Sequence, residues 1–186
     1  MQRHGGWIYV CGPSGAGKDS VMAWARERLG ARNGVSFARR LVTRAAAPGS
    51  TDDSIAAAEF ERLLASGGLA MHWRAHGTAY GIARAYRGQV DRGDWVVVNG
   101  SREHVASMER EELGRTRIVF VTAPAEVIAR RLQQRGREAG TAIDERIERG
   151  TALPPPRADC MIVNDSALEK AGARFVEFVE RCAALR

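Results

Sequence analysis

The chain has 186 residues, of which 45% are hydrophobic and 27% charged, and its formal net charge is +6. This length predicts one domain, residues 1–186, large enough to bury a core, and the composition excludes a low-complexity or fibrous protein. No apolar stretch approaches the roughly 20 residues that a membrane-spanning helix needs.

The charged residues and the cysteines narrow the class of partner. No basic run with interleaved aromatic residues occurs, so we expect neither nucleic acid nor a membrane as a partner, but small anionic ligands. Cys11, Cys160 and Cys182 lie too far apart for a local metal cluster and leave an odd thiol. That pattern favours a reducing compartment, and we expect the cytoplasm. The oligomeric state stays open.

The first elements frame a glycine-rich loop. The apolar run Trp7–Cys11 predicts a strand, and a helix is expected from about Lys18 to Gly30. The loop between them has G-x-x-x-x-G-K spacing, in which backbone N–H groups and a helix N-terminus surround a phosphate. Only Lys18 and Lys170 are lysines, so a lysine at the position that reaches the outer phosphates is informative. The expected ATP-binding residues are Gly12, Pro13, Ser14, Gly15, Ala16, Gly17, Lys18, Asp19 and Ser20.

Asp19 departs from the motif, which usually has a Ser or Thr hydroxyl on Mg²⁺ at this place. A carboxylate is a hard oxygen ligand that suits Mg²⁺, directly or through a water. Two alternatives stay open: Ser20 supplies the hydroxyl, or Asp19 only favours the helix N-terminus by its charge.

The first half of the chain continues with short elements. Val35–Arg44 is expected to be extended, and its three arginines and Thr43 form an anion-recognition composition. The next expected elements are a loop Ala45–Ser54, a helix Ala57–Ser66, a strand Leu69–Trp73, a glycine-punctuated turn His76–Gly81 and a helix Ile82–Asp91.

The second half alternates strands and helices. Trp95–Val98 is a continuous apolar run typical of a buried parallel strand, and polar residues Asn99–Arg102 follow at the sheet edge where α/β proteins bind ligands. The next expected elements are helix Glu103–Leu113, strand Arg117–Val121, helices Pro124–Gln134 and Ile143–Arg149, strand Cys160–Val163 and a final amphipathic helix. The alternation predicts an α/β fold with a mostly parallel central sheet flanked by helices.

An arginine-rich segment at about 135–150 resembles a lid. Arg135 and Arg137 flank Gly136, and Arg146 lies in the next expected helix. Phosphoryl transfer needs cations that close over the phosphates once water is expelled. We therefore expect Arg135 and Arg146, with Lys18, to be the catalytic cations.

Taken together, these motifs resemble the guanylate-kinase-like P-loop kinases and, among them, the ribose 1,5-bisphosphate phosphokinases of bacterial phosphonate breakdown. The motifs are the loop Gly12–Ser20, Thr43–Arg44, His76–Gly81, Val98–Arg102, Arg135–Glu138 and Asn164–Asp165. The resemblance implies that the γ-phosphoryl of ATP passes to ribose 1,5-bisphosphate, giving 5-phosphoribosyl 1-diphosphate.

The resemblance also assigns the acceptor site, in a substrate-binding region of about residues 35–82. Arg40, Arg44 and Tyr80 would hold a phosphate, and Asn99, Ser101 and Arg102 the rest of the sugar bisphosphate. Two acidic residues that guanylate kinases use to read guanine are missing: His72 stands near one site and Asn99 at the other.

Two alternatives remain. A nucleoside monophosphate kinase would phosphorylate GMP instead. A non-catalytic binding module or a GTPase-type switch is disfavoured by the intact glycine loop and by the absence of an Asn-Lys-x-Asp motif.

Overall fold

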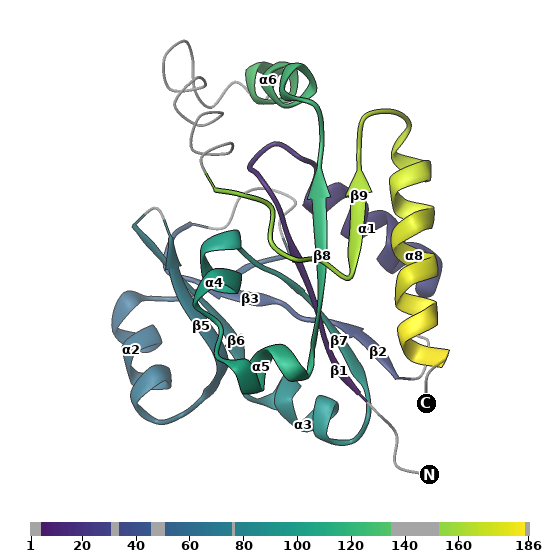
Figure 1. Ribbon diagram of the computed structural model, residues 1–186. Coiled ribbons are helices and arrows are strands. Elements are labelled where there is room, and N and C mark those ends of the chain that lie inside the picture. The colour runs from purple at the N-terminus through teal and green to yellow at the C-terminus, as the bar shows by residue number, and fades with distance from the viewer. Residues whose placement is uncertain (1–4, 31–33, 46–50, 76, 135–152, 185–186) are drawn as a thin grey trace.

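A five-stranded parallel sheet forms the centre of the protein, in the strand order β2-β7-β1-β8-β9. The computed structural model describes residues 5–30, 34–45, 51–75, 77–134 and 153–184 (Figure 1). The strands are β1 (Gly6–Cys11), β2 (Val35–Phe37), β7 (Trp95–Asn99), β8 (Thr116–Thr122) and β9 (Cys160–Val163). This confirms the predicted fold class.

Alternating residues of each strand bury opposite faces of this sheet. Ile8 and Val10 face the helices α1 (Lys18–Leu29) and α8 (Leu168–Ala184), which pack side by side. Tyr9 faces the opposite side of the sheet. There it belongs to a second apolar cluster with Trp73, Val90 and Val105. Complete burial of a valine or isoleucine contributes about 1.5–3 kcal/mol, so both layers hold the loops at the sheet edge in place.

A second sheet covers the other face, and the sequence did not predict it. Its order is β4-β3-β6-β5, and β3 and β5 each pair antiparallel with β6. Its strands are β3 (Arg40–Val42), β4 (Asp53–Ser54), β5 (Leu69–Ala75) and β6 (Thr78–Ala83). Helix α2 (Ala57–Ala65), which was predicted, packs Phe60 against this small sheet beside Gly81.

The segment Val35–Arg44 is extended as predicted, but it forms two strands in two different sheets, because β2 pairs with β7 and β3 with β6. Two other expectations in this region were wrong. His76–Gly81 is not a single turn, since residues from Thr78 onward form β6 against β5. Helix α3 (Ala85–Asp91) therefore begins later than predicted, after the strand has ended.

The predicted helix Glu103–Leu113 is two helices, α4 (Arg102–Ser107) and α5 (Arg110–Gly114). The break is physical: Met108 is extended and buried, and Glu109 starts the second helix with a capping box to Glu112. Helix α6 (Ala125–Gln134) follows β8 as predicted and lies above the sheet edge in Figure 1.

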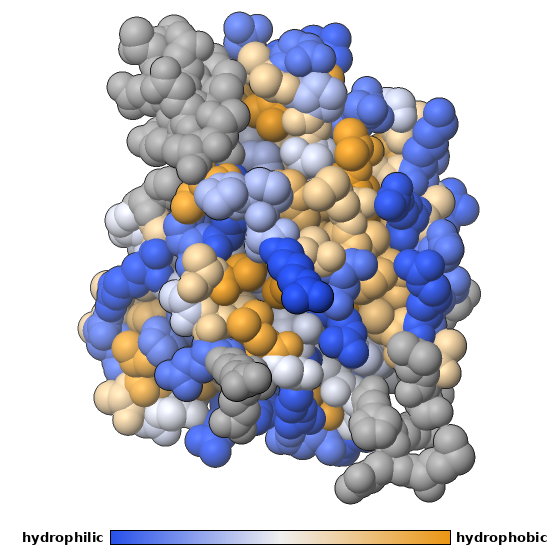
Figure 2. Space-filling view, viewed as in Figure 1, coloured by the Kyte–Doolittle hydropathy of each residue, from blue (hydrophilic) through white to orange (hydrophobic). Residues whose placement is uncertain are grey.

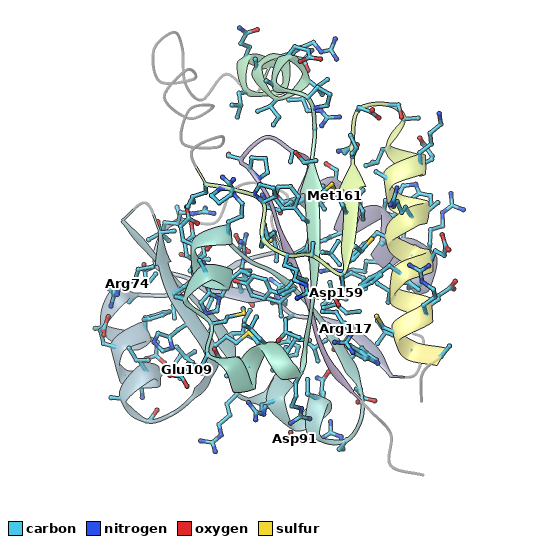
Figure 3. The ribbon with its side chains drawn as sticks, viewed as in Figure 1. Arg74, Asp91, Glu109, Arg117, Asp159 and Met161 are labelled. Carbon is cyan, nitrogen blue, oxygen red and sulfur yellow. The ribbon has the colours of Figure 1, made fainter. Side chains whose placement is uncertain are left out.

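The face seen in Figure 2 has hydrophilic rims and apolar residues gathered over β8 and β9. Met161, labelled in Figure 3, and Val163 are exposed there by 45% and 46%. Asp159 precedes β9, and its carboxylate accepts the Ile118 N–H at 2.7 Å, which fixes the chain beside β8. Within the described residues, no helix is both long and apolar enough to cross a membrane.

Candidate active site

The glycine loop turns from the end of β1 into α1. Gly17 is the N-cap of α1 and has left-handed backbone angles, φ 85° and ψ 24°. A side chain there would be strained, and its Cβ would lie 2.4 Å from the Asn164 Nδ2. The loop backbone thus stays bare at the helix N-terminus, the arrangement that binds phosphate.

Lys18 folds back over this loop. Its ammonium donates to the carbonyl oxygens of Gly12 at 2.9 Å and Pro13 at 3.1 Å. Burial lowers the pKa of Lys18 to about 8, and the Asp19 carboxylate partly opposes this shift. An anion bound in the loop would favour the charged form of Lys18.

Asp19 and Asn99 meet at the edge of the sheet. The Asn99 Nδ2 donates to the Asp19 Oδ1 at 2.5 Å, while the Asn99 Oδ1 is buried without a partner in the described part of the protein. Among the described residues, no group of three or more His, Cys, Asp or Glu side chains could hold a metal. One carboxylate next to the exposed Ser20 nevertheless fits Mg²⁺, which usually keeps several waters and takes one or two protein ligands.

A cavity of about 300 Å³ opens beside the loop, between α1, α6 and the β9–α8 connection. Its lining residues are Gly17, Ser20, Arg131, Gln134, Asn164, Ser166 and Leu168. Asn164 donates from Nδ2 to the Ala16 carbonyl oxygen at 2.9 Å, which ties the loop to the end of β9. Its buried Oδ1 has no partner among the described residues.

The cavity lining includes four residues to which the sequence prediction gave no role, although Asn164–Asp165 was one of the motifs of the resemblance: Arg131, Gln134, Asn164 and Ser166. One signal could have found Asn164 and Ser166: they follow the last parallel strand, and the carboxyl ends of parallel strands share one edge of the sheet. Arg131 carried no such signal, because its place beside Ala16 depends on how α6 packs.

The predicted acceptor residues gather on the small sheet. Arg40 lies over the Tyr80 ring, 5.4 Å from its centroid, and donates from Nη1 to the Asn99 carbonyl oxygen at 3.3 Å. Both Arg40 and Arg44 also contact Asp52, a buried carboxylate that the sequence analysis read only as a loop residue. The structure thus brings Arg40, Arg44 and Tyr80 together, and Arg40 joins them to Asn99.

Ser101 and Arg102 lie at the end of β7, where their contacts are partly structural. The Ser101 hydroxyl accepts the His104 N–H at 3.1 Å and so caps α4. Arg102 donates to the Leu153 carbonyl oxygen at 2.7 Å. Gly100 must be glycine, since a Cβ there would lie 1.9 Å from the Tyr9 ring.

A buried hydrogen-bonded chain supports this turn from below. The Ser101 N–H donates to the Tyr9 hydroxyl at 3.2 Å, which lies 2.7 Å from the His104 Nδ1. Burial raises the pKa of Tyr9 and lowers the pKa of His104 to about 4, with His72 adding to the latter shift. Both groups are therefore neutral near pH 7, and one hydrogen bond joins the Tyr9 hydroxyl to the imidazole.

The predicted lid at 135–150, with Arg135 and Arg146, lies outside the described residues.

Comparisons with known proteins identify the family of this chain. An "AAA domain" family model matches residues 8–151. The ribose 1,5-bisphosphate phosphokinase PhnN of Chelativorans sp. is 43% identical over 98% of this chain and 88% of its own length. The chain belongs to the AAA domain family by this match and to the ribose 1,5-bisphosphate phosphokinase family by its relatives.

Two further comparisons concern a longer relative and a solved structure with the same fold. A bifunctional ribose 1,5-bisphosphokinase-thymidine phosphorylase of Cupriavidus necator is 41% identical over 95% of this chain, which spans 29% of that protein's length. The crystal structure of guanylate kinase from Anaplasma phagocytophilum aligns with this protein over 97% of this chain and 87% of the guanylate kinase chain. The TM-score is 0.69 and the sequence identity is 19%. That likeness shows the shared fold alone.

Proposed function

We propose that this protein transfers the γ-phosphoryl group of ATP to ribose 1,5-bisphosphate, giving 5-phosphoribosyl 1-diphosphate and ADP. The observation that carries the proposal is the 43% identity to a ribose 1,5-bisphosphate phosphokinase over nearly the whole of both chains. We place the reaction in phosphonate breakdown in the cytoplasm, which agrees with three buried free cysteines. The small-molecule partners are then ATP and a sugar phosphate.

The chemistry needs positioning and cations rather than a base. An oxygen of the 1-phosphate attacks the γ-phosphorus, the new P–O bond forms, and the bond to the bridging oxygen breaks as ADP leaves with the electron pair. The attacking oxygen is already anionic at neutral pH, so no proton has to be removed. In this proposal the loop backbone holds the β- and γ-phosphates and Lys18 follows the transferred group.

The donor base would occupy the cavity beside the loop. Its polar lining and volume of about 300 Å³ suit a nucleobase next to the phosphates. The orphaned Asn164 Oδ1 offers an acceptor for an amino group there. Mg²⁺, held by Asp19 or Ser20 in part through waters, would neutralise charge on the phosphates.

The acceptor would bind on the small sheet. Arg40, Arg44 and Tyr80 are proposed for one phosphate, and Asn99, Ser101 and Arg102 for the far end of the sugar bisphosphate. Asn99 would act in part through Asp19, to which its amide donates. Arg135 and Arg146 stay predicted lid cations.

An ADP-release assay with product detection tests the proposal. Wild-type protein is expected to form 5-phosphoribosyl 1-diphosphate from ATP and ribose 1,5-bisphosphate, with GMP a poor acceptor. A site without guanine-reading acceptors leaves each unmatched donor unpaired, at about 1–3 kcal/mol. Efficient phosphorylation of GMP, with ribose 1,5-bisphosphate inert, would replace this proposal by a nucleotide kinase.

A further inference from the structure

Two consecutive arginines pair with two consecutive aspartates, in very different surroundings. Arg39 and Asp53 form a bidentate pair on the surface, with side chains 52% and 43% exposed. Arg40 and Asp52 form the same fork, with Nε–Oδ1 at 2.8 Å and Nη2–Oδ2 at 3.0 Å, but are only 14% and 3% exposed. The second pair therefore lies inside the protein beside the predicted acceptor site.

The buried fork aims Arg40 in one direction. Asp52 occupies the Nε and Nη2 edge of the guanidinium, so Nη1 points to the Asn99 carbonyl oxygen at 3.3 Å. The flat face of the same group lies over the Tyr80 ring. Because an arginine side chain has many rotamers, a bidentate carboxylate is the contact that removes this freedom.

Asp52 also reaches the second acceptor arginine. The Arg44 Nη2 lies 3.5 Å from Oδ2, and the Arg44 side chain is 39% exposed. Two guanidiniums held close together repel each other, and a carboxylate between them offsets that repulsion. The cluster of Arg40, Arg44 and Asp52 keeps a net positive charge. Arg44 is partly exposed to solvent, whereas Arg40 is mostly buried and held by Asp52.

The same contacts connect the acceptor side to the phosphate loop. Arg40 contacts the backbone of Asn99, and the Asn99 amide donates to Asp19 next to Lys18. Arg40 thus contacts the backbone of Asn99, and only the Asn99 side chain contacts the phosphate-loop residue Asp19.

We propose that Asp52 is the positioning residue of the acceptor-phosphate pocket, holding Arg40 and Arg44 in the arrangement that receives one phosphate of the substrate. The inference rests on the proposed function for the identity of the substrate. The binding of a phosphate group by Arg40 and Arg44 is argued from the arginine cluster itself. Asp52 does not touch the substrate; it acts through the two arginines.

Steady-state kinetics of Asp52→Asn test this role, because the amide keeps the size but cannot accept both arms of the fork. The KM for ribose 1,5-bisphosphate is expected to rise by about tenfold or more, while the KM for ATP stays within about twofold. Asp53→Asn, which breaks the neighbouring exposed pair, is the matched control and should leave both constants within about twofold. An unchanged acceptor KM in folded Asp52→Asn, or an equal rise in both constants, would overturn the inference.

A double-mutant cycle separates positioning from general structure. If Asp52 acts through Arg40, then Asp52→Asn adds about threefold or less once Arg40→Gln is present. Asp52→Glu keeps a carboxylate but displaces it from the fork, and should show the same acceptor-only defect; it supplies the answer if Asp52→Asn does not fold, as judged by thermal unfolding. Independent effects in the cycle would contradict the proposal.

Direct binding of ribose 5-phosphate by calorimetry distinguishes the two proposals. A wild-type protein that binds this phosphate ester but makes no 5-phosphoribosyl 1-diphosphate would end the proposed function only. Asp52→Asn is still expected to weaken that binding by about tenfold. Equal binding by the wild type and the variant would refute the role of Asp52 whatever the reaction is.

Discussion

The parallel sheet and the small sheet build their halves of the site by different means. On the parallel sheet, buried strands deliver a bare backbone loop and one lysine that folds back on it. On the small sheet, short strands present arginines that are held by a carboxylate. The donor half thus depends on backbone shape, whereas the acceptor half depends on side-chain charges, and substitutions should affect the two halves differently.

The largest effect is expected in the donor half. Lys18→Met keeps the side-chain stem but removes the charge that follows the transferred phosphoryl group, so kcat should fall at least about a hundredfold. Circular dichroism should show a folded protein, because the change leaves the loop backbone intact. Near-normal turnover would mean that the loop does not bind the donor.

A second change tests the junction of the two halves. Asn99→Asp replaces the amide that donates to Asp19 with a second carboxylate 2.5 Å away. Like charges at that distance share a proton or separate. We expect kcat with ribose 1,5-bisphosphate to fall about tenfold or more, and the Mg²⁺ concentration for half-maximal rate to change. Titration with Mg²⁺ at saturating substrates measures both; an unaltered Mg²⁺ dependence would separate Asp19 from the metal.

The pH dependence of ATP binding sharpens the assignment of Lys18. The pKa of about 8 lies below the usual lysine value because of burial, so the ammonium is lost as the pH rises through 8. If only the charged form binds, the Kd for ATP weakens about tenfold between pH 7 and 9. Calorimetry at fixed excess Mg²⁺ measures this, and Lys18→Met should show a flat profile over the same range.

The smallest effect concerns the support beneath the acceptor turn. The pKa of His104 is lowered from the ordinary 6.5 to about 4 in the folded protein. As the pH falls, this histidine is therefore protonated in the unfolded chain before it is protonated in the folded protein. Its contribution to stability is complete above pH 6.5 and is lost as the pH falls toward 4, on the order of 1–2 kcal/mol after solvent screening. His104→Phe keeps a ring beside Trp73 but cannot titrate. Thermal unfolding of the two proteins should therefore converge on acidification; parallel curves would contradict this.

The sequence predicted the local elements of the parallel sheet better than it predicted the small sheet. Trp95–Val98 and the Gly12–Lys18 loop are continuous local patterns, and both lie where the pattern indicated. The switch of sheet after Phe37 is not local, because the partners that separate β2 from β3 are β7 and β6, far along the chain.

The contact of Asp52 with Arg40 could not be predicted either, because it also depends on the pairing of strands that are apart in the sequence. Asp52 and Asp53 are adjacent acids in a segment read as a loop, and nothing in the sequence marks which of them becomes buried. Pairing of β3 with β4 sets it, since Asp53 stands opposite Leu41 in that register; from there the Asp52 side chain reaches Arg40 and the Asp53 side chain reaches Arg39. Asn99 and Asp19 were both predicted as site residues, but their contact joins the end of β7 to the first turn of α1, and only the pairing of β1 with β7 brings these together.

The excursion of the chain between β2 and β7 has a consequence for the ancestry and engineering of such proteins. The chain leaves the parallel sheet at Phe37 and returns at Trp95, and these strands pair, with the Ala38 N–H donating to the Val97 carbonyl oxygen at 2.8 Å. The small sheet, with Arg40, Arg44 and Tyr80, therefore belongs to a segment whose two ends meet, the geometry that tolerates insertion and exchange. A homologous segment grafted between these two joints would exchange Arg40, Arg44 and Tyr80 and leave the glycine loop and Asn99 of the parallel sheet in place.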